Sequence, residues 1–446
     1  MRARKRGRPS AFEDSFRRVR IGLLRLLREV WLGFLIGVVA PLGVWGLGKV
    51  HWSSSSHSHR AVAPGPHLRR PVPARSFLER LIPPPGGRLP GVHVDTQIRK
   101  AVAKLPLDRK IAQLLLVGFA GRTIKAPFYG TLGRIDLGGV AFNRDNYQSP
   151  DQISTLAAGV SNTTSDPRTH TPPFIVAPQE GGDFSAFPNL PPFDNAADLH
   201  STSLAAREAR DASKALTQIG FNGVLAPDLD VSASTDQPLA GRAFSDVPSR
   251  VSAYATATIG AYRSAHMLSA PGHFPGIGAA GQSTDQGPTE VGLSMKDLGR
   301  RDLVPFRAAI RAGAQAILLG HAGYQPDDFV VPASLSRAIA TRLLRGQLGF
   351  KGMAITDDLE AGAITSQTTV PKAAVTAIQA GADMVWISGP ESDWLGAYRA
   401  ILAAVRSKRV PMLRINTAVT RIITAKRELG LKNQKRTIPL GAPGSQ

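Results

Sequence analysis

Between residues 94 and 432, short apolar runs alternate with longer segments in which apolar residues recur every three or four positions. The predicted strands are 111–117, 139–142, 174–177, 223–226, 267–270, 316–319, 353–356 and 384–387. Helical segments include 203–219, 249–266, 298–312, 334–344, 371–380 and 395–407. Strands that alternate with helices pair in parallel, because each helix carries the chain back to the start of the next strand. The pattern predicts a single α/β domain, a (β/α)8 barrel of the TIM type, with an open doubly wound sheet as the alternative.

Residues 30–48 contain no charged side chain and read VWLGFLIGVVAPLGVWGLG. A helix of this length spans about 30 Å, the thickness of a hydrocarbon core. Arginine and lysine are dense in residues 1–29, and positive charge before a span stays in the cytoplasm. We therefore expect one transmembrane helix at 30–48, a cytoplasmic N-terminus, and a barrel held outside the cytoplasm at the cell membrane. A cleaved signal peptide is the alternative, but no convincing small-x-small cleavage site follows the span, which favours an uncleaved anchor.

Residues 49–93 are rich in serine, histidine, proline, glycine and arginine, as in HWSSSSHSHR and IPPPGG. Such a composition buries little apolar surface, so we expect a flexible Pro/Ser-rich linker. Its histidines are irregularly spaced, which favours solvated side chains over a metal site. After the barrel domain at 94–432, residues 433–446 are polar and basic, and we expect a loose tail.

The chain carries a formal net charge of +21 and no cysteine. Much of the positive charge lies in the N-terminal segment, the linker and the C-terminal part, without a nucleic-acid-binding motif. Anionic lipid headgroups or wall polymers are therefore expected partners, and nucleic acid is not. The absence of cysteine excludes disulfides, thiolate metal sites and a cysteine nucleophile. Without an HExxH motif or a phosphate-binding glycine loop, we expect no metal and no cofactor. The sequence leaves the oligomeric state open.

Polar residues follow most of the predicted strands. In a parallel barrel these positions share one rim, where active sites form. The set comprises Asn143, Arg144, Asp145, Gln179, Glu180, Asp228, Asp230, His273, His321, Asp357, Asp358 and Ser388. An Asp or Ser after a strand also begins the next helix as a cap, so Asp358 and Ser388 have a structural interpretation as well. The concentration of polar groups at one rim predicts a site there.

Ten segments add specificity through their order along the chain. They are LDRKIAQLLLVGF, GGVAFNRDN, FIVAPQEGG, FPNLPP, IGFNGVLAPDLDV, GRAFSDVP, GHFPGIG, RDLVPFRAAIRAGAQAILLGHAGY, LLRGQLGFKGMAITDDLEAGAI and AGADMVWI. In this order they resemble the N-terminal barrel domain of glycoside hydrolase family 3, in particular the bacterial β-N-acetylhexosaminidases that use this domain alone. The resemblance covers roughly residues 100–430. Each motif is weak by itself, whereas ten in the same order are specific.

The resemblance implies a retaining glycosidase whose nucleophile is Asp357, in ITDDLEAGAI. A carboxylate at the rim can attack the anomeric carbon of a sugar and form a covalent glycosyl-enzyme. Arg242 in GRAFSD and His273 in GHFPG match substrate-binding positions of the family. Glu180 and His321, at the same predicted rim, are further substrate-binding candidates. The structural alternatives are a surface ion pair for the arginine and a buried, hydrogen-bonded role for the histidine.

Several departures from the family pattern fall on the chemistry. The family has a lysine where this chain has Gly272, and a second histidine where it has Ile277. The family's D-Q-E-G-G-R becomes PQEGGD at 178–183. This change removes the aspartate that usually binds sugar hydroxyls and the arginine after the glycines.

The general acid/base of the family is also missing. The loop after GHFPGIG normally carries an Asp-x-His pair, whereas the aligned residues here are Ser283, Thr284 and Asp285. A general acid is commonly worth about 10²–10⁴ in rate. Asp285 would replace the histidine as a catalytic residue if burial kept its carboxyl protonated. Glu290 is a weaker candidate, and an exposed, ordinary aspartate at 285 is the alternative.

Three functions are compatible with these observations. The first is an anchored glycoside hydrolase that cleaves glycans containing β-N-acetylhexosamine, such as those of the cell wall, through Asp357 and Asp285. The second is a catalytically impaired barrel that binds a glycan or serves as a scaffold, which Pro178, Gly272 and the missing histidine favour. The third is another activity on the same scaffold, such as transglycosylation or the use of an activated leaving group.

Overall fold

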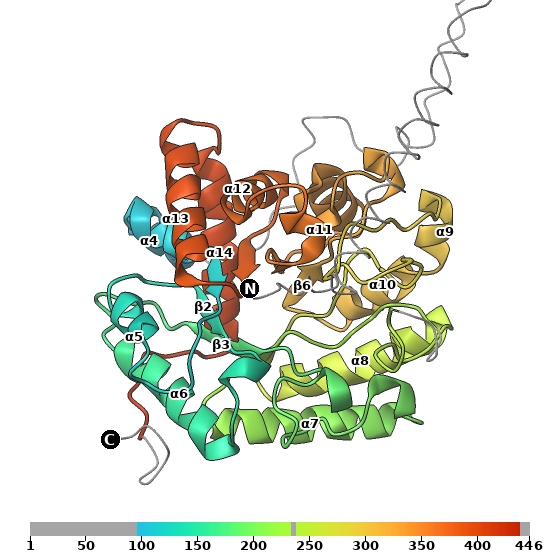
Figure 1. Ribbon diagram of the computed structural model, residues 1–446, viewed down its shortest axis with the longest axis horizontal. Coiled ribbons are helices and arrows are strands. Elements are labelled where there is room, and N and C mark those ends of the chain that lie inside the picture. The colour runs from blue at the N-terminus through green and yellow to red at the C-terminus, as the bar shows by residue number, and fades with distance from the viewer. Residues whose placement is uncertain (1–95, 233–237, 438–446) are drawn as a thin grey trace, which may run out of the picture. The chain divides into compact units, whose positions relative to one another are not determined.

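Eight parallel strands form one sheet in the computed structural model, which describes residues 96–232 and 238–437 (Figure 1). The strands are β1 (Leu115–Val117), β2 (Gly139–Ala141), β3 (Phe174–Ala177), β4 (Gly223–Val224), β5 (Leu268–Ser269), β6 (Ala316–Leu319), β7 (Met353–Asp358) and β8 (Met384–Ile387). Their order is β5-β4-β3-β2-β1-β8-β7-β6, so neighbours in the sheet are also neighbours in sequence apart from β1 and β8. This ring-like order confirms the parallel barrel over the open doubly wound sheet.

The barrel is closed between β5 and β6 by residues just beyond β5. The Phe274 backbone N–H donates to the carbonyl of Leu318 at 2.8 Å, and Gly320 donates to the Phe274 carbonyl at 2.9 Å. The Leu318 N–H donates to the Pro271 carbonyl at 2.9 Å. These bonds continue the ladder where β5 itself is short, so segment 271–274 completes the ring.

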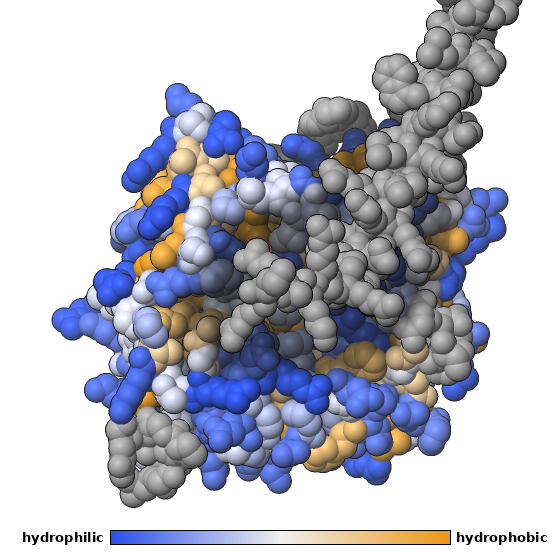
Figure 2. Space-filling view, in the orientation of Figure 1, coloured by the Kyte–Doolittle hydropathy of each residue, from blue (hydrophilic) through white to orange (hydrophobic). Residues whose placement is uncertain are grey.

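Helices surround the strands (Figure 1). They are α3 (Thr96–Lys104), α4 (Leu107–Ala112), α5 (Pro127–Leu132), α6 (Pro150–Thr163), α7 (Thr202–Gln218), α8 (Pro248–Ser264), α9 (Met295–Arg300), α10 (Leu303–Arg311), η6 (Ala338–Gln347), α11 (Gly362–Thr365), α12 (Val370–Ala380), α13 (Glu391–Arg406) and α14 (Met412–Glu428). Short 3-10 turns are η1 (Arg144–Asn146), η2 (Gly182–Phe184), η3 (Ala196–Asp198), η4 (Gln325–Asp327) and η5 (Ala333–Leu335). On the face in Figure 2, hydrophilic side chains predominate, as expected for helices whose apolar side packs on a sheet.

Local sequence explains several element boundaries. Ser149 and Ser201 cap α6 and α7 by accepting the N–H bonds of Gln152 and Leu204, which satisfies donors at the helix starts. Two expectations were wrong in detail. Ile111 and Ala112 end helix α4 instead of starting a strand, and the segment predicted as one helix at 298–312 is divided into α9 and α10.

The strands are buried along almost their whole length, because the helices cover one side of the sheet and the barrel interior the other. Every residue of β1 to β6 and of β8 is buried. In β7 only the last two residues, Asp357 and Asp358, are partly exposed. The one strand end that reaches solvent therefore carries the two acidic residues of the predicted nucleophile motif.

The predicted segments 1–29, 30–48 and 49–93 lie outside the described residues. Within the described part of the chain, no helix combines the length and apolar character that a membrane crossing requires. The start of the predicted loose tail is bound to the barrel instead. Asn433 donates to the carbonyl of Thr164 at 2.7 Å, and Arg436 exchanges backbone hydrogen bonds with the side chain of Asn162 at 2.7 and 3.0 Å. Residues 438–446 lie outside the described residues.

A buried ion cluster is centred on Asp383, just before β8. Its Oδ2 accepts from Arg345 at 2.7 Å, and its Oδ1 accepts from Arg414 at 2.9 Å and Arg421 at 3.0 Å. The Asp383 side chain is completely buried. Burial raises the pKa of this carboxyl, but the three guanidinium groups lower it by more, to about 2. The cluster links η6, β8 and α14 at the amino ends of the strands.

We expect Asp383→Asn to lower the free energy of unfolding by about 3–5 kcal/mol, because it leaves buried guanidinium groups without their carboxylate. Urea denaturation of the full-length protein, followed by circular dichroism, measures this change. The matched control is Asp166→Asn, which breaks an exposed ion pair with Arg168 and should leave the midpoint unchanged. Equal midpoints for all three proteins would contradict a structural role for the cluster.

Candidate active site

A pocket opens at the carboxyl ends of the strands and brings most of the predicted site residues together. It is lined by Pro178, Glu180, Leu225, Pro238, Leu239, Arg242, His273, Ile277, Ser283, Thr284, Asp285, Leu318, Asp357, Asp358 and Trp386. These residues come from separate loops and strand ends, as in other parallel barrels. Five of the six predicted site residues are among them, and His321 is not.

Asp357 is positioned by an irregularity in the sheet. Ile355 pairs with Met384, but Asp358 pairs with Trp386, so β7 carries one residue more than β8 between these pairs. Such a bulge changes the direction in which a side chain points, and bulges often occur next to active sites. The Asp357 side chain is 13% exposed, and its Oδ1 accepts the N–H of Asp358 at 2.9 Å. The bulge therefore presents this carboxylate to the pocket.

Asp358 supports the backbone around the nucleophile candidate. Its Oδ1 accepts the N–H groups of Ser388 at 3.0 Å and of Glu360 at 3.2 Å, which ties the end of β7 to the end of β8. Burial raises the pKa of Asp358. These contacts support the predicted structural role of Asp358, and its side chain also lines the pocket.

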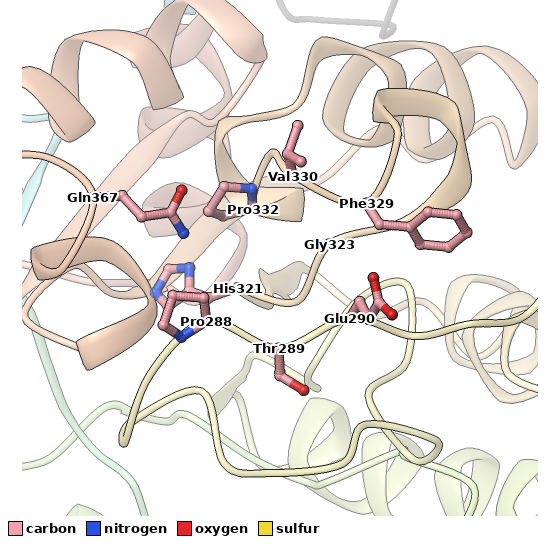
Figure 3. Close-up of a pocket in the computed structure, with 9 residues that line it drawn as sticks. All are labelled: Pro288, Thr289, Glu290, His321, Gly323, Phe329, Val330, Pro332 and Gln367. Carbon is pink, nitrogen blue, oxygen red and sulfur yellow. The ribbon is translucent and has the colours of Figure 1, made fainter. Parts of the chain in front are cut away.

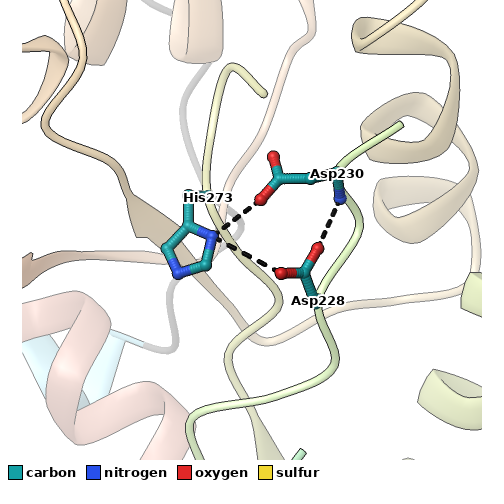
Figure 4. A group of neighbouring side chains, drawn as sticks. All are labelled: Asp228, Asp230 and His273. Atoms are coloured by element: carbon teal, nitrogen blue, oxygen red, sulfur yellow. Dashed lines mark hydrogen bonds and ion pairs between the residues drawn. The ribbon is translucent and has the colours of Figure 1, made fainter. Parts of the chain in front are cut away.

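His273 lies in the loop after β5, where its ring faces the carboxylates of Asp228 and Asp230 (Figure 4). Its Nδ1 is 2.8 Å from Oδ2 of Asp230 and 3.8 Å from Oδ2 of Asp228, and its Nε2 is 3.8 Å from Oδ2 of Asp357. Burial and the Arg242 guanidinium lower the pKa of His273. The hydrogen bond and charge of Asp230 and the charge of Asp357 raise it by more, to about 10. The ring is therefore positively charged at neutral pH.

Arg242 forms a two-point ion pair with Glu180. Nε lies 2.5 Å from Oε2 and Nη2 lies 2.6 Å from Oε1. The guanidinium also lies 3.2 Å from Oδ2 of Asp228 and 3.1 Å from Nε2 of His273. The predicted surface ion pair is thus an ion pair inside the pocket. It fixes the orientation of the guanidinium, since a planar fork binds a carboxylate at two points.

Asp228 and Asp230 lie beneath the pocket. Asp228 accepts the N–H of Asp230 through Oδ1 at 2.7 Å, and its buried Oδ2 has no hydrogen-bond partner among the described residues. Burial and the charge of Asp230 raise the pKa of Asp228 well above its usual range. Ligand atoms of these two residues and His273 lie within 4.8 Å of one another, a spacing that suits a metal ion. In this structure Arg242 and the His273 ring supply the positive charge beside them.

Asp285 lies at the pocket, but its side chain is exposed. Its carboxylate accepts the Ser283 hydroxyl at 3.3 Å. Its carbonyl accepts the N–H of Gly362 at 3.0 Å, and the Thr284 carbonyl accepts that of Ala363 at 2.9 Å. The segment is therefore attached to α11, just after the nucleophile candidate. The burial that would keep the Asp285 carboxyl protonated is not present.

His321 lines a neighbouring pocket instead of the main one (Figure 3). Its Nδ1 lies 2.8 Å from the Ser334 hydroxyl, and its Nε2 lies 2.8 Å from the Asp358 carbonyl. Both ring nitrogens are thus used within the protein. The other residues of this second pocket are Pro288, Thr289, Glu290, Gly323, Phe329, Val330, Pro332 and Gln367.

Trp386 is the aromatic residue among the pocket residues that the sequence analysis missed, which also include Leu225, Pro238, Leu239 and Leu318. Trp386 lies two positions after Met384 in β8, so the two side chains are on the same face of the strand. Only 9% of the Trp386 surface is exposed. The sequence signal that was available is the strand MVWI itself, because alternate residues of a strand share one face. The backbone of Trp386 also binds the residues on either side of Asp357. Its backbone N–H donates to the Thr356 hydroxyl and its carbonyl accepts the N–H of Leu359, each at 3.0 Å.

Sequence comparisons agree with this architecture. The model described as the glycosyl hydrolase family 3 N terminal domain matches residues 106–425. A protein named Beta-hexosaminidase from Stenotrophomonas maltophilia is 31% identical over 288 residues, which are 62% of this chain and 84% of that protein. A Beta-hexosaminidase from Xanthomonas oryzae pv. oryzae is 31% identical over 316 residues, which are 68% of this chain and 89% of that protein.

Solved structures give the same result. A glycoside hydrolase family 3 beta-N-acetylglucosaminidase from Paenibacillus sp. matches with a TM-score of 0.71 and 28% identity. The match covers 76% of this chain and 65% of that chain, so this protein spans less than two thirds of that relative. A Beta-N-acetylhexosaminidase from Beutenbergia cavernae matches with a TM-score of 0.66 and 27% identity, over 73% of this chain and 99% of that one. The chain therefore belongs to glycoside hydrolase family 3, through its N-terminal barrel domain.

Proposed function

We propose that this protein is a retaining glycoside hydrolase whose nucleophile is Asp357. The observation that carries the proposal is the position of this carboxylate on the β7 bulge, 3.8 Å from the ring of His273 and inside the family's pocket. Its Oδ1 accepts the N–H of Asp358 at 2.9 Å, and the side chain lines the pocket. An ionised carboxylate is the form that attacks carbon.

The reaction follows from this geometry in two steps. In the first, an oxygen of Asp357 bonds to the anomeric carbon as the bond to the leaving oxygen breaks, and that oxygen takes a proton. In the second, water attacks the same carbon, the bond to Asp357 breaks, and the water gives up one proton, which replaces the proton that the first step consumed. The sugar is released and the carboxylate is restored. Arg242 and His273 present N–H groups in the pocket, which suits sugar hydroxyl or acetamido oxygens.

The substrate we propose is a glycan that contains β-N-acetylhexosamine. The support comes from relatives named Beta-hexosaminidase and beta-N-acetylglucosaminidase, which share this domain at about 30% identity. We also propose that residues 30–48 anchor the barrel outside the cytoplasm, close to cell-wall glycans. The uncharged run and the basic segment before it support this location.

Proton supply to the leaving group is the weak step of the proposed mechanism. Asp285 is the acidic residue nearest in sequence to the family's acid/base position, and it lines the pocket. Its side chain is exposed, so it lacks the burial on which the predicted role as proton donor depends. We therefore expect activated glycosides to be cleaved much faster than glycosides with basic leaving groups.

The second candidate function is a glycan-binding barrel with little turnover. The exposure of Asp285 favours it, and so does the tight pairing of Arg242 with Glu180, which occupies a group expected to bind substrate. The two functions differ in whether any glycoside is cleaved. An activity assay therefore separates them.

We expect Asp357→Ala to reduce kcat for para-nitrophenyl β-N-acetylglucosaminide by about 10⁴-fold or more, because the covalent step is lost. The assay uses the full-length protein, with circular dichroism to verify folding. Asp211→Asn, an exposed aspartate on α7, is the control and should retain full activity. Equal rates for wild type and Asp357→Ala would remove Asp357 from the mechanism.

We expect Asp285→Asn to reduce the rate to different extents on two kinds of substrate. If Asp285 donates the proton, the variant loses about 10²–10⁴ in rate on an alkyl or disaccharide glycoside. On the para-nitrophenyl glycoside it should lose little, since that leaving group departs without protonation. A similar loss on both substrates would contradict the role of Asp285 as acid, and no cleavage of either by folded wild type would favour the binding protein.

A further inference from the structure

Residues 406–413 join the end of α13 to the start of α14, and we call this segment the α13–α14 corner. The Arg409 carbonyl accepts the side-chain amide of Gln379 at 3.0 Å, and Arg414, directly after the corner, donates to the Ile378 carbonyl at 3.0 Å. Both sides of the corner are thus bound to the end of α12. Because the two contacts reach neighbouring residues, the side chains before and after the turn lie close together.

The corner lies at the amino ends of the strands. Arg414 donates at 2.9 Å to Asp383, which directly precedes β8. In a parallel barrel each helix returns the chain from the carboxyl end of one strand to the amino end of the next. The pocket lies at the opposite end, since Asp357 and Asp358 at the carboxyl end of β7 line it. A surface bound to the corner would therefore leave the pocket facing away from it.

Two adjacent large apolar side chains of the corner are exposed. Leu413 is 77% exposed and Met412 is 40% exposed. The other exposed large apolar side chains in the described part of the chain are far apart in sequence: Phe193, Val247 and Val330. Apolar residues exposed singly are normal, whereas contiguous apolar surface bordered by polar residues is a sign of an interaction site. Within the corner only Val410 is buried, which holds the turn on the protein while its neighbours face solvent.

Three exposed cations of the corner accompany these apolar side chains, namely Arg406, Lys408 and Arg409. None of them forms an ion pair with a carboxylate of the described residues. Residues 394–427 contain no aspartate or glutamate, and Asp108 of α4, whose charge reaches α13, offsets at most one of the three cations. Lys408 has a φ of 61°, in the left-handed region where glycine is the usual residue, so the geometry of the turn does not favour a lysine there. The corner therefore combines a net positive charge with exposed apolar surface.

We infer that the α13–α14 corner is a contact surface for a bilayer that contains anionic phospholipid. Its two apolar side chains enter the headgroup region, and its three cations lie beside the lipid phosphates. Each lysine or arginine near an anionic bilayer raises the affinity by about fivefold. A soluble polyanion would use the cations alone, whereas the exposed leucine and methionine gain contact only where apolar surface is offered as well. The contact goes beyond the proposed function, because it does not require that the pocket cleave a glycoside, and it turns the pocket away from the lipid.

The test uses the full-length protein, which contains no cysteine, so that one introduced cysteine carries one fluorescent label. Leu413→Cys is labelled with a nitrobenzoxadiazole dye, whose emission rises in apolar surroundings. The matched control is Val330→Cys, because Val330 is similarly exposed, at 68%, and lines the second pocket at the other end of the barrel. Both proteins are mixed with vesicles of phosphatidylcholine alone and of phosphatidylcholine with phosphatidylglycerol. We expect the anionic vesicles to raise the emission at position 413 by about twofold and to leave that at position 330 unchanged. If residues 30–48 anchor the chain, the protein binds both kinds of vesicle, and the emission at position 413 still depends on lipid charge.

The role of the cations is tested in the labelled Leu413→Cys protein. Replacing the three cations of the corner together by glutamine should lower the equilibrium constant for insertion by about 100-fold, as three factors of about five predict. The control replaces three exposed cations of α7 by glutamine and so removes the same net charge; they are Arg207, Arg210 and Lys214. This control should insert as strongly as the parent protein. Salt at about 1 M, where the Debye length is about 3 Å, should weaken insertion of the parent. Circular dichroism verifies folding, and hydrolysis of the para-nitrophenyl glycoside should not change in either triple variant.

Insertion at position 413 that requires both phosphatidylglycerol and the three cations supports the inference. No response at position 413 in a folded protein overturns it, and so does an equal response at positions 413 and 330, since the barrel would then have no preferred orientation. Emission that rises with protein concentration in the absence of vesicles would assign the corner to a second copy of the chain. A response to soluble polyphosphate but not to vesicles would assign it to a polyanion such as a wall polymer. Either result overturns the lipid contact, and the hydrolysis assay judges the proposed function separately.

Discussion

Residues 271–277 determine both the closure of the barrel and the chemistry of its pocket. Their backbone completes the ring between β5 and β6 through Phe274, and their one ionisable side chain, His273, bonds to Asp230. Asp230 also accepts the N–H of Ile277, so a single carboxylate fixes both ends of the turn. Gly276 has a φ of 119°, and a side chain there would meet Asp302. A change in this turn would therefore alter the barrel and the charge beside Asp357 together.

Buried charge is arranged in opposite senses at the two ends of the barrel. At the amino ends of the strands, one carboxylate at Asp383 is surrounded by three guanidinium groups. At the carboxyl ends, Arg242 and His273 are surrounded by several carboxylates. In the first cluster both oxygens of Asp383 accept from guanidinium groups of the protein, so the carboxylate links parts of the fold. The second keeps a carboxylate, Asp357, partly exposed to a pocket, which is the arrangement that binding and catalysis require.

The pocket keeps the nucleophile position of its family and changes much of what surrounds it. The ring of His273 links two other pocket residues, since its Nε2 lies 3.8 Å from Asp357 and 3.1 Å from Arg242. The family's lysine, second histidine and acid/base histidine are replaced. The replacements Gly272 and Ile277 remove polar groups, and Asp285 places a carboxyl group where the family has an imidazole. The departures from the family motif therefore lie around Asp357 and not at Asp357 itself.

The sequence by itself determined the barrel and predicted most of the ionisable residues that line its pocket. Alternating strands and helices predict parallel strands, and motif order identified Asp357, Arg242 and His273, because burial period and local motifs are properties of neighbouring residues. Tertiary structure alone decided the pairing of Arg242 with Glu180, 62 positions away, and of His273 with Asp230, 43 positions away. It also brought Trp386 to the pocket, turned His321 toward Ser334, and left Asp285 exposed. The physical reason is that contacts between strand ends depend on closure of the ring and on the β7 bulge, which no local pattern encodes.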